Sequence, residues 1–130
     1  MAAATSPIFT DTVRYAAATI STANTNRDGT GTIGTVFTAG ADGSLISKVR
    51  ANAIVTTTAG MVRLYVYTGS VYYLIAELTV DAITVSGTVA AWVEDWTPPG
   101  GSLLLPSGHS LRASTHNAES FNIHAIGGDF

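Results

Sequence analysis

Apolar and polar residues alternate with a period of two along several short stretches of this chain. The clearest case is residues 45–55, where small and branched residues fall on one face and polar residues on the other. The first face carries Val49, Ala51, Ala53 and Val55, and the second carries Lys48, Arg50 and Asn52. A period of two over this length predicts a β-strand with one buried face.

A second pattern predicts a hairpin over residues 61–80. Residues 61–67 and 71–80 alternate in the same way, and Thr68-Gly69-Ser70 between them is a tight-turn sequence. We expect one face of this hairpin to enter the core, with Val62, Leu64, Val66, Leu74 and Leu78. The other face then points outward with Tyr65, Tyr67, Tyr73 and Ile75. An outward apolar patch of this kind would be an association surface.

Further strands are predicted at 13–22, 33–38 and 89–97, and a last hairpin pairs 109–115 with 120–126. Residues 103–105 form a short apolar patch between two turn sequences. About eight short strands follow one another with turn sequences between them and no helical stretch. This spacing is typical of an antiparallel two-sheet sandwich, and we predict a jelly roll. Residues 1–12 show no period and are predicted to be an extended N-terminal arm, followed by a single domain over 13–130.

Composition agrees with an all-β chain and narrows the function. Threonine occurs 19 times, whereas there is one lysine and no glutamine, so the surface lacks the residues that helices use. The net charge is −3 and the six basic residues are scattered, which argues against nucleic acid as a partner. No apolar run reaches the roughly 18 residues of a membrane span, so no membrane is expected. The absence of cysteine fits a protein made in the cytoplasm.

The polar residues offer little sign of catalysis. His109, His116 and His124 match no short metal-ligand spacing, although His116 and His124 could meet across the last hairpin; we interpret all three as surface or interface residues. No nucleophile motif surrounds a serine. Glu94 and Asp95 are adjacent, so on a strand they point to opposite faces and cannot act together from one side.

Two loop sequences resemble ligand-binding loops in part. The glycine-rich residues 27–34 lack the Lys-Ser/Thr of a phosphate loop, and residues 24–29 carry oxygen ligands but not the full calcium-loop pattern. Calcium is a minor alternative. We therefore expect no cofactor, no resident metal and no enzymatic activity.

Aromatic residues point instead to binding. Trp92, Glu94 and Trp96 share one face of the predicted strand 89–97, and two tryptophans flanking a carboxylate could stack on a sugar ring. The alternative is that the tryptophans fill the core or a subunit interface, where tryptophan is common. The residues predicted to contact another subunit or a capsid are Ile8, Phe9, Tyr65, Tyr67, Tyr73, Trp92 and Trp96.

Residues 20–53, 56–69 and 103–130 together resemble small virion proteins of tailed bacteriophages, of the capsid decoration or cement type. The resemblance implies a jelly roll that forms a homotrimer and binds the major capsid protein on the outer surface of the head. Related jelly rolls occur in head fibres, tail fibres and baseplates. The alternative function is therefore a carbohydrate- or receptor-binding module using Trp92, Glu94 and Trp96.

Overall fold

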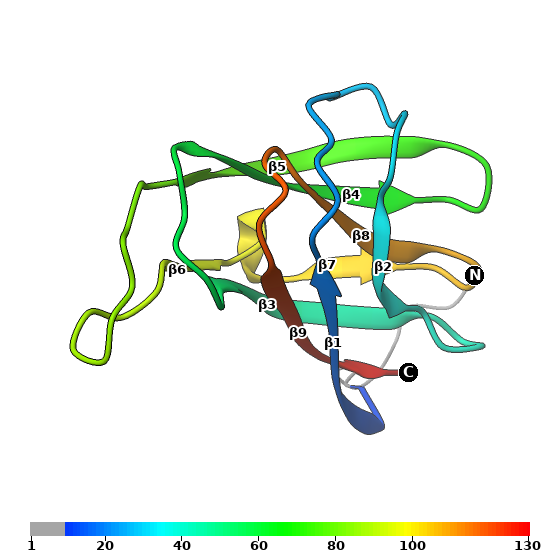
Figure 1. The fold of residues 1–130 in the computed structure, drawn as a ribbon. Helices are drawn as coiled ribbons and strands as arrows, with labels where there is room; N and C mark the ends of the chain where they lie inside the picture. The colour runs from blue at the N-terminus through cyan, green and yellow to red at the C-terminus, as the bar shows by residue number, and fades with distance from the viewer. Residues whose placement is uncertain (1–9) are drawn as a thin grey trace, which may run out of the picture.

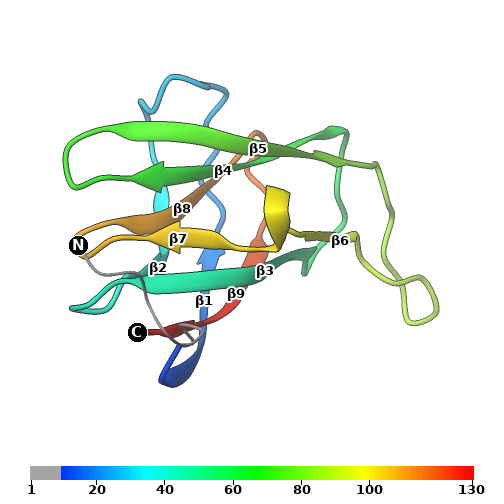
Figure 2. The same ribbon diagram turned by 180° about the vertical axis from the view of Figure 1, so that it is seen from behind.

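The computed structural model describes residues 10–130, which form two antiparallel β-sheets facing each other across one hydrophobic core (Figures 1 and 2). The first sheet has the strand order β1 (Thr12–Ile20), β9 (Phe121–Asp129), β3 (Ser44–Ala53), β6 (Val93–Trp96), and β7 (Leu103–Leu105) also pairs with β3. The second has the order β2 (Gly34–Thr38), β8 (Ser110–Thr115), β4 (Gly60–Tyr67), β5 (Tyr72–Val80). The prediction of an all-β, two-sheet sandwich is confirmed.

The strand order is that of a jelly roll, because the chain changes sheet at almost every connection. The β4–β5 hairpin, predicted over 61–80, stays within the second sheet, and the consecutive strands β6 and β7 both belong to the first. The predicted hairpin of 109–115 with 120–126 is wrong. Strand β8 pairs with β2 and β4, while β9 pairs with β1 and β3 in the opposite sheet. The short 116–120 connection therefore crosses the sandwich.

Strands β6 and β7 share one position in the first sheet. Both pair antiparallel with β3, β6 along residues 49–52 and β7 along residues 44–46. A 3-10 turn over Pro99–Gly101 separates them, and Gly100 and Gly101 both have positive φ angles, of 81° and 90°. The proline-glycine sequence thus breaks one strand in two, which gives nine strands in the described residues where about eight were expected.

A bulge in β5 changes which side chains face the core. Leu64 pairs with Ala76 and Tyr65 pairs with Leu74, so Ile75 has no partner in the register. One extra residue reverses the side-chain alternation beyond it. Consequently Leu74 shares the outer face with Tyr65 instead of entering the core with Leu78, and Ile75 is half-buried and packs against the core.

The core lies between the two sheets and is built by the alternating residues of both. Val49, Ala51 and Ala53 are buried as the period predicted, whereas Val55 lies beyond the end of β3 and is exposed. Trp92 packs edge-on against Phe121, with ring centroids 5.7 Å apart. The β5–β6 connection projects from one end of the sandwich (Figure 1). No helix among the described residues is long and apolar enough to cross a membrane.

Candidate functional site

The outer face of the first sheet carries a group of exposed apolar side chains. Residues that pair directly across strands share a face. One row across the sheet joins Val13, Gly128, Leu45 and Leu104, and the next joins Tyr15 to Ile126. The exposed fractions are 88% for Val13, 63% for Tyr15, 60% for Leu104 and 44% for Ile126. We call Val13, Tyr15, Leu104 and Ile126 the outer patch.

The chain enters the domain at this patch. Thr10 is the first described residue, and a Cβ added to Gly128 would lie 2.6 Å from its Oγ1. Thr10 therefore rests over Gly128, in the middle of the row that contains Val13 and Leu104. The Asp11 amide donates a hydrogen bond to the Asp129 carbonyl, at 2.8 Å, which fixes this entry.

The other half of the same face is polar. His124 lies between Tyr15, whose hydroxyl contacts Nδ1, and Asn52, whose Oδ1 is 3.0 Å from Nε2. Arg50 makes two hydrogen bonds to Asp95, at 2.6 and 3.0 Å, and Lys48 lies 3.4 Å from the same carboxylate. The hydrogen bond from Arg50, with a smaller one from Lys48, lowers the pKa of Asp95 to about 2. The face thus combines an apolar end with a hydrogen-bonded, ion-paired end.

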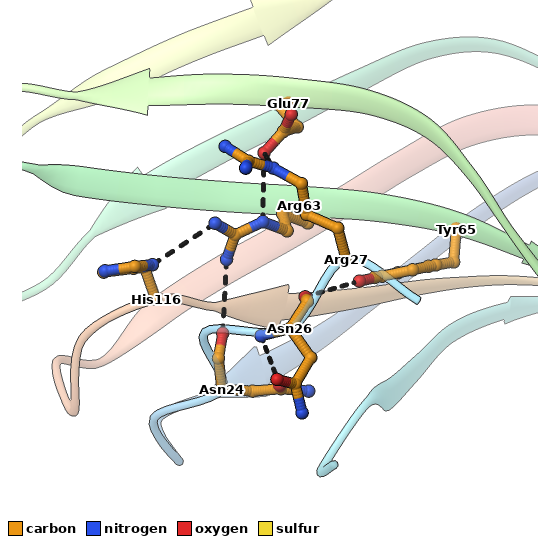
Figure 3. A network of polar contacts seen from close by, with 7 residues as sticks. All are labelled: Asn24, Asn26, Arg27, Arg63, Tyr65, Glu77 and His116. Carbon is orange, nitrogen blue, oxygen red and sulfur yellow. Dashed lines mark hydrogen bonds and ion pairs between the residues drawn. The ribbon is translucent and has the colours of Figure 1, made fainter. Parts of the chain in front are cut away.

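The outer face of the second sheet is covered by the chain itself. Residues 21–33 cross it, and Arg63 on β4 holds them there (Figure 3). The Arg63 side chain is 2% exposed; it donates hydrogen bonds to Glu77 Oε2 at 3.0 Å, the Asn24 carbonyl at 3.2 Å and His116 Nδ1 at 3.2 Å. Arg27, which is itself on this loop, also pairs with Glu77, at 2.7 Å.

Aromatic rings continue this packing along the β4–β5 hairpin. The Tyr65 hydroxyl donates to the Asn26 carbonyl at 3.0 Å, which ties the ring under the loop. Tyr67 and Tyr72 stack with centroids 4.3 Å apart, and the Arg112 guanidinium lies 4.3 Å from the Tyr67 centroid. These contacts fill the face with the chain's own side chains.

The predicted interface residues therefore divide into several groups. Tyr65 is fully buried, so the prediction that it faces a neighbour is wrong; the loop over the sheet covers it. Tyr67 is half-buried beneath the Arg112 guanidinium. Tyr73 is 58% exposed on edge strand β5. Trp92 is buried in the core and Trp96 half-buried against it. Ile8 and Phe9 lie outside the described residues.

The proposed sugar platform does not form. Trp92 and Glu94 do lie on the core-facing side of the sheet, as the period implied, because Glu94 pairs with the buried Ala51 and the Ala53 amide donates to the Trp92 carbonyl. That side is covered at Trp92, whose ring packs on Phe121, and only Glu94 of the three is exposed. A sugar ring cannot stack on a tryptophan that the core has already covered.

The candidate metal residues are also dispersed. His116 contacts Arg63 on the second sheet, while His124 lies on the outer face of the first, so they do not meet. In the loop, Asn24 Oδ1 accepts the Asn26 amide and Asp28 Oδ1 accepts the Thr30 amide and hydroxyl. Within residues 10–130, no three His, Asp or Glu side chains gather as a metal site would require.

Sequence reasoning missed the outer patch. The sequence predicts one strand with Val13 and Tyr15 and another with Ile126, but it pairs the second strand with residues 109–115 and assigns no outward face to the first. The alternation of Val13 and Tyr15 with Arg14 was a usable signal.

Three comparisons with known proteins give no relative. No protein-family model, no curated protein and no solved structure matches this chain.

Proposed function

We propose that this chain is a non-enzymatic structural protein of a tailed-bacteriophage virion. In this proposal it is made in the host cytoplasm, forms a homotrimer and decorates the outside of the head by binding the major capsid protein. The jelly-roll strand order agrees with the sequence resemblance to small virion proteins of tailed bacteriophages. It does not by itself indicate a role, because this fold carries many functions.

The outer patch is the observation that carries the proposal. Large apolar side chains exposed together are characteristic of surfaces that contact another protein. Val13, Tyr15 and Ile126 occupy neighbouring positions of β1 and β9, which pair in an uninterrupted register. Burying such side chains yields about 25 cal/mol for each Å² of apolar area removed from water.

The N-terminal arm acts at the same place in this proposal. Thr10 rests over Gly128, so the nine residues before it are attached beside the outer patch. Ile8 and Phe9 are the large apolar residues closest in sequence to that point. The arm and the patch would then contact one capsid surface together.

Capsid co-sedimentation of single-site variants tests the role of the patch. Val13→Asp and Leu104→Asp each place a carboxylate in the patch, and Val89→Asp is the matched control, because Val89 is 47% exposed in the distant β5–β6 connection. We expect the two patch variants to bind capsids at least about tenfold more weakly, since a buried unpaired charge is costly. The control should bind like the unaltered protein.

Light scattering tests the trimer separately. The expected mass is three times the 13.4 kDa of the chain. A monomer at micromolar concentration would contradict the trimer, and equal capsid binding by Val13→Asp and Val89→Asp would contradict the docking surface. If the patch variants become monomers, the patch joins copies of the chain and does not meet the capsid.

A further inference from the structure

His116 and Arg63 meet beside the point where the 21–33 loop crosses the second sheet (Figure 3). A guanidinium donates hydrogen bonds but cannot accept them. Arg63 Nη2 lies 3.2 Å from His116 Nδ1, so this ring nitrogen is the acceptor and carries no proton. The folded protein therefore holds His116 as a neutral imidazole with its proton on Nε2.

A proton on Nδ1 would break this contact. The nitrogen would become a donor facing a donor, and the imidazolium would lie against a guanidinium of the same charge. Whether the ring turns away or the guanidinium moves, Arg63 loses an acceptor. The Arg63 side chain is 2% exposed, and a buried donor left without an acceptor costs free energy.

No carboxylate is placed to compensate the added charge. Within residues 10–130, no carboxylate oxygen lies within 4.0 Å of a His116 ring nitrogen. The acidic side chains of the surrounding elements are bound by other groups: Glu77 by Arg63 and Arg27, Glu119 by Thr58, and Asp28 by Thr30. Figure 3 shows Glu77 beyond Arg63 as seen from His116. Arg63 is therefore the charged group that faces the ring.

The same guanidinium holds the loop. Its Nη1 donates to the Asn24 carbonyl at 3.2 Å, while its Nη2 meets His116. The group is planar and rigid, so a movement that separates Nη2 from the ring also displaces Nη1 from the loop. The protonation state of His116 is thereby connected to the position of Asn24.

The closed loop also keeps one hydroxyl unsatisfied. Ser114 pairs with Arg63 across β8 and β4, so it lies on the same covered face. It is 1% exposed, and its Oγ makes no hydrogen bond within the described residues. Opening of the loop would admit water to this hydroxyl and recover part of the cost of burying it.

We propose that His116 is a pH-sensitive switch for the 21–33 loop. Neutral His116 helps Arg63 to hold the loop over the second sheet, and protonated His116 weakens this hold. The open loop accepts the proton and the closed loop does not, so closure is favoured at neutral pH and is weakened as the pH falls from about 7 to about 5, where histidines take up a proton.

Opening of the loop uncovers an aromatic surface. Tyr65 is fully buried while its hydroxyl donates to the Asn26 carbonyl, and it lies on the face that the loop covers. At acidic pH the protein thus exposes a tyrosine that it covers at neutral pH. This switch does not depend on the virion role.

Amide hydrogen exchange, followed by NMR between about pH 7 and about pH 5, tests the switch. The Asn24 amide donates to the Thr115 carbonyl and the Asn26 amide to Asn24 Oδ1, so both report on the loop. We expect their protection, corrected for the intrinsic effect of pH on exchange, to fall at least about threefold, since one net hydrogen bond corresponds to a factor of about 2–10. The Ala53 amide, bonded to the Trp92 carbonyl in the first sheet, should keep its protection.

Two outcomes of this experiment would overturn the proposal. Constant protection at Asn24 and Asn26 would show that the loop does not respond to the proton. An equal fall at Ala53 would show that acid weakens the whole fold and not the loop alone.

Three histidine variants assign the effect to one ring. His116→Asn places an amide oxygen, which accepts at any pH, near the position of Nδ1, so we expect the protection of the loop to stay high at both pH values. His116→Leu has no acceptor, so protection should be low at both. His124→Asn is the matched control: His124 lies on the outer face of the first sheet, between Tyr15 and Asn52, and the fall should remain. An undiminished fall in His116→Asn, or unaltered protection in His116→Leu, would contradict the switch.

Discussion

Arg63 is a buried side chain that holds the 21–33 loop over the outer face of the second sheet. Its guanidinium can only donate hydrogen bonds, and each of its three nitrogens finds an acceptor, one on β5, one on the 21–33 loop and one on His116. Because the charge is paired and hydrogen-bonded, it can be buried without a prohibitive cost. The same bonds bring the loop down over Tyr65.

Replacing Arg63 with methionine should destabilise the protein by about 2–4 kcal/mol, because Glu77 and the Asn24 carbonyl lose a buried donor. Arg27→Met is the matched control: this arginine bonds the same carboxylate but is 60% exposed, so its loss should cost about 1 kcal/mol or less. Urea unfolding monitored by tryptophan fluorescence measures both. Equal losses of unfolding free energy in the two variants would show that the burial of Arg63 adds nothing to stability.

The lowered pKa of Glu77 predicts how the stability of the fold depends on pH. The hydrogen bond from Arg27, followed by the one from Arg63, holds the pKa of Glu77 below its ordinary value of 4.5. A lowered folded-state pKa means that the ionised form stabilises the fold above the unfolded value, and that this contribution is lost as the pH falls through the folded-state pKa. Stability should therefore decline below about pH 4.5, and Glu77→Gln should show a shallower decline. Urea midpoints from neutral pH down to about pH 3 check this, and parallel curves would exclude Glu77.

At the scale of elements, the 21–33 loop fits closely against the β4–β5 hairpin. Gly29 has a φ of +86°, and a Cβ there would lie 2.7 Å from Tyr72 Cβ. Tyr72 reaches this position because the bulge at Ile75 turns it to the outer face, where it pairs with Tyr67. The bulge therefore places Tyr72 where only a residue without a side chain fits at position 29.

Alanine substitutions at three glycines separate strain from crowding. Gly29→Ala should cost about 2–4 kcal/mol, since both the backbone and the contact with Tyr72 oppose it. Gly101→Ala has a positive φ but open space around it, and should cost about 1 kcal/mol. Gly87→Ala has neither penalty and should change stability by less than about 0.5 kcal/mol. Thermal unfolding gives the order, and a Gly29 effect no larger than that of Gly101 would remove the crowding argument.

For the whole molecule, the two outer faces differ in kind. One is covered by the chain's own loop and aromatic stack, and the other leaves Val13, Tyr15 and Ile126 exposed. Of the two outer faces, only that of the first sheet therefore exposes this group of large apolar side chains to neighbouring molecules. The association surface expected on the Tyr65 face is covered by the chain itself, and the exposed apolar side chains lie on the opposite sheet.

Removal of residues 1–9 tests the arm. The predicted arm extends to residue 12, but a deletion to that point would also remove part of the folded domain. The Asp11 amide donates to the Asp129 carbonyl, and Thr12 begins β1. We expect the shortened protein to keep its melting temperature and its oligomeric state and to bind capsids more weakly. Capsid binding equal to that of the full chain would remove the arm from the proposed function, and a lowered melting temperature would give it a structural role instead.

The sequence alone determined where the strands lie, because alternation and turn residues act over a few neighbouring positions. Residues 45–55 and 61–80 are examples, each observed within two residues of its predicted bounds. The tertiary structure alone decided what covers each strand. Whether Tyr65 is buried, Val13 exposed or Ser114 left without a partner depends on the 21–33 loop and on strands far away in the chain. Burial is a property of packed surfaces, and the local pattern of one strand does not contain it.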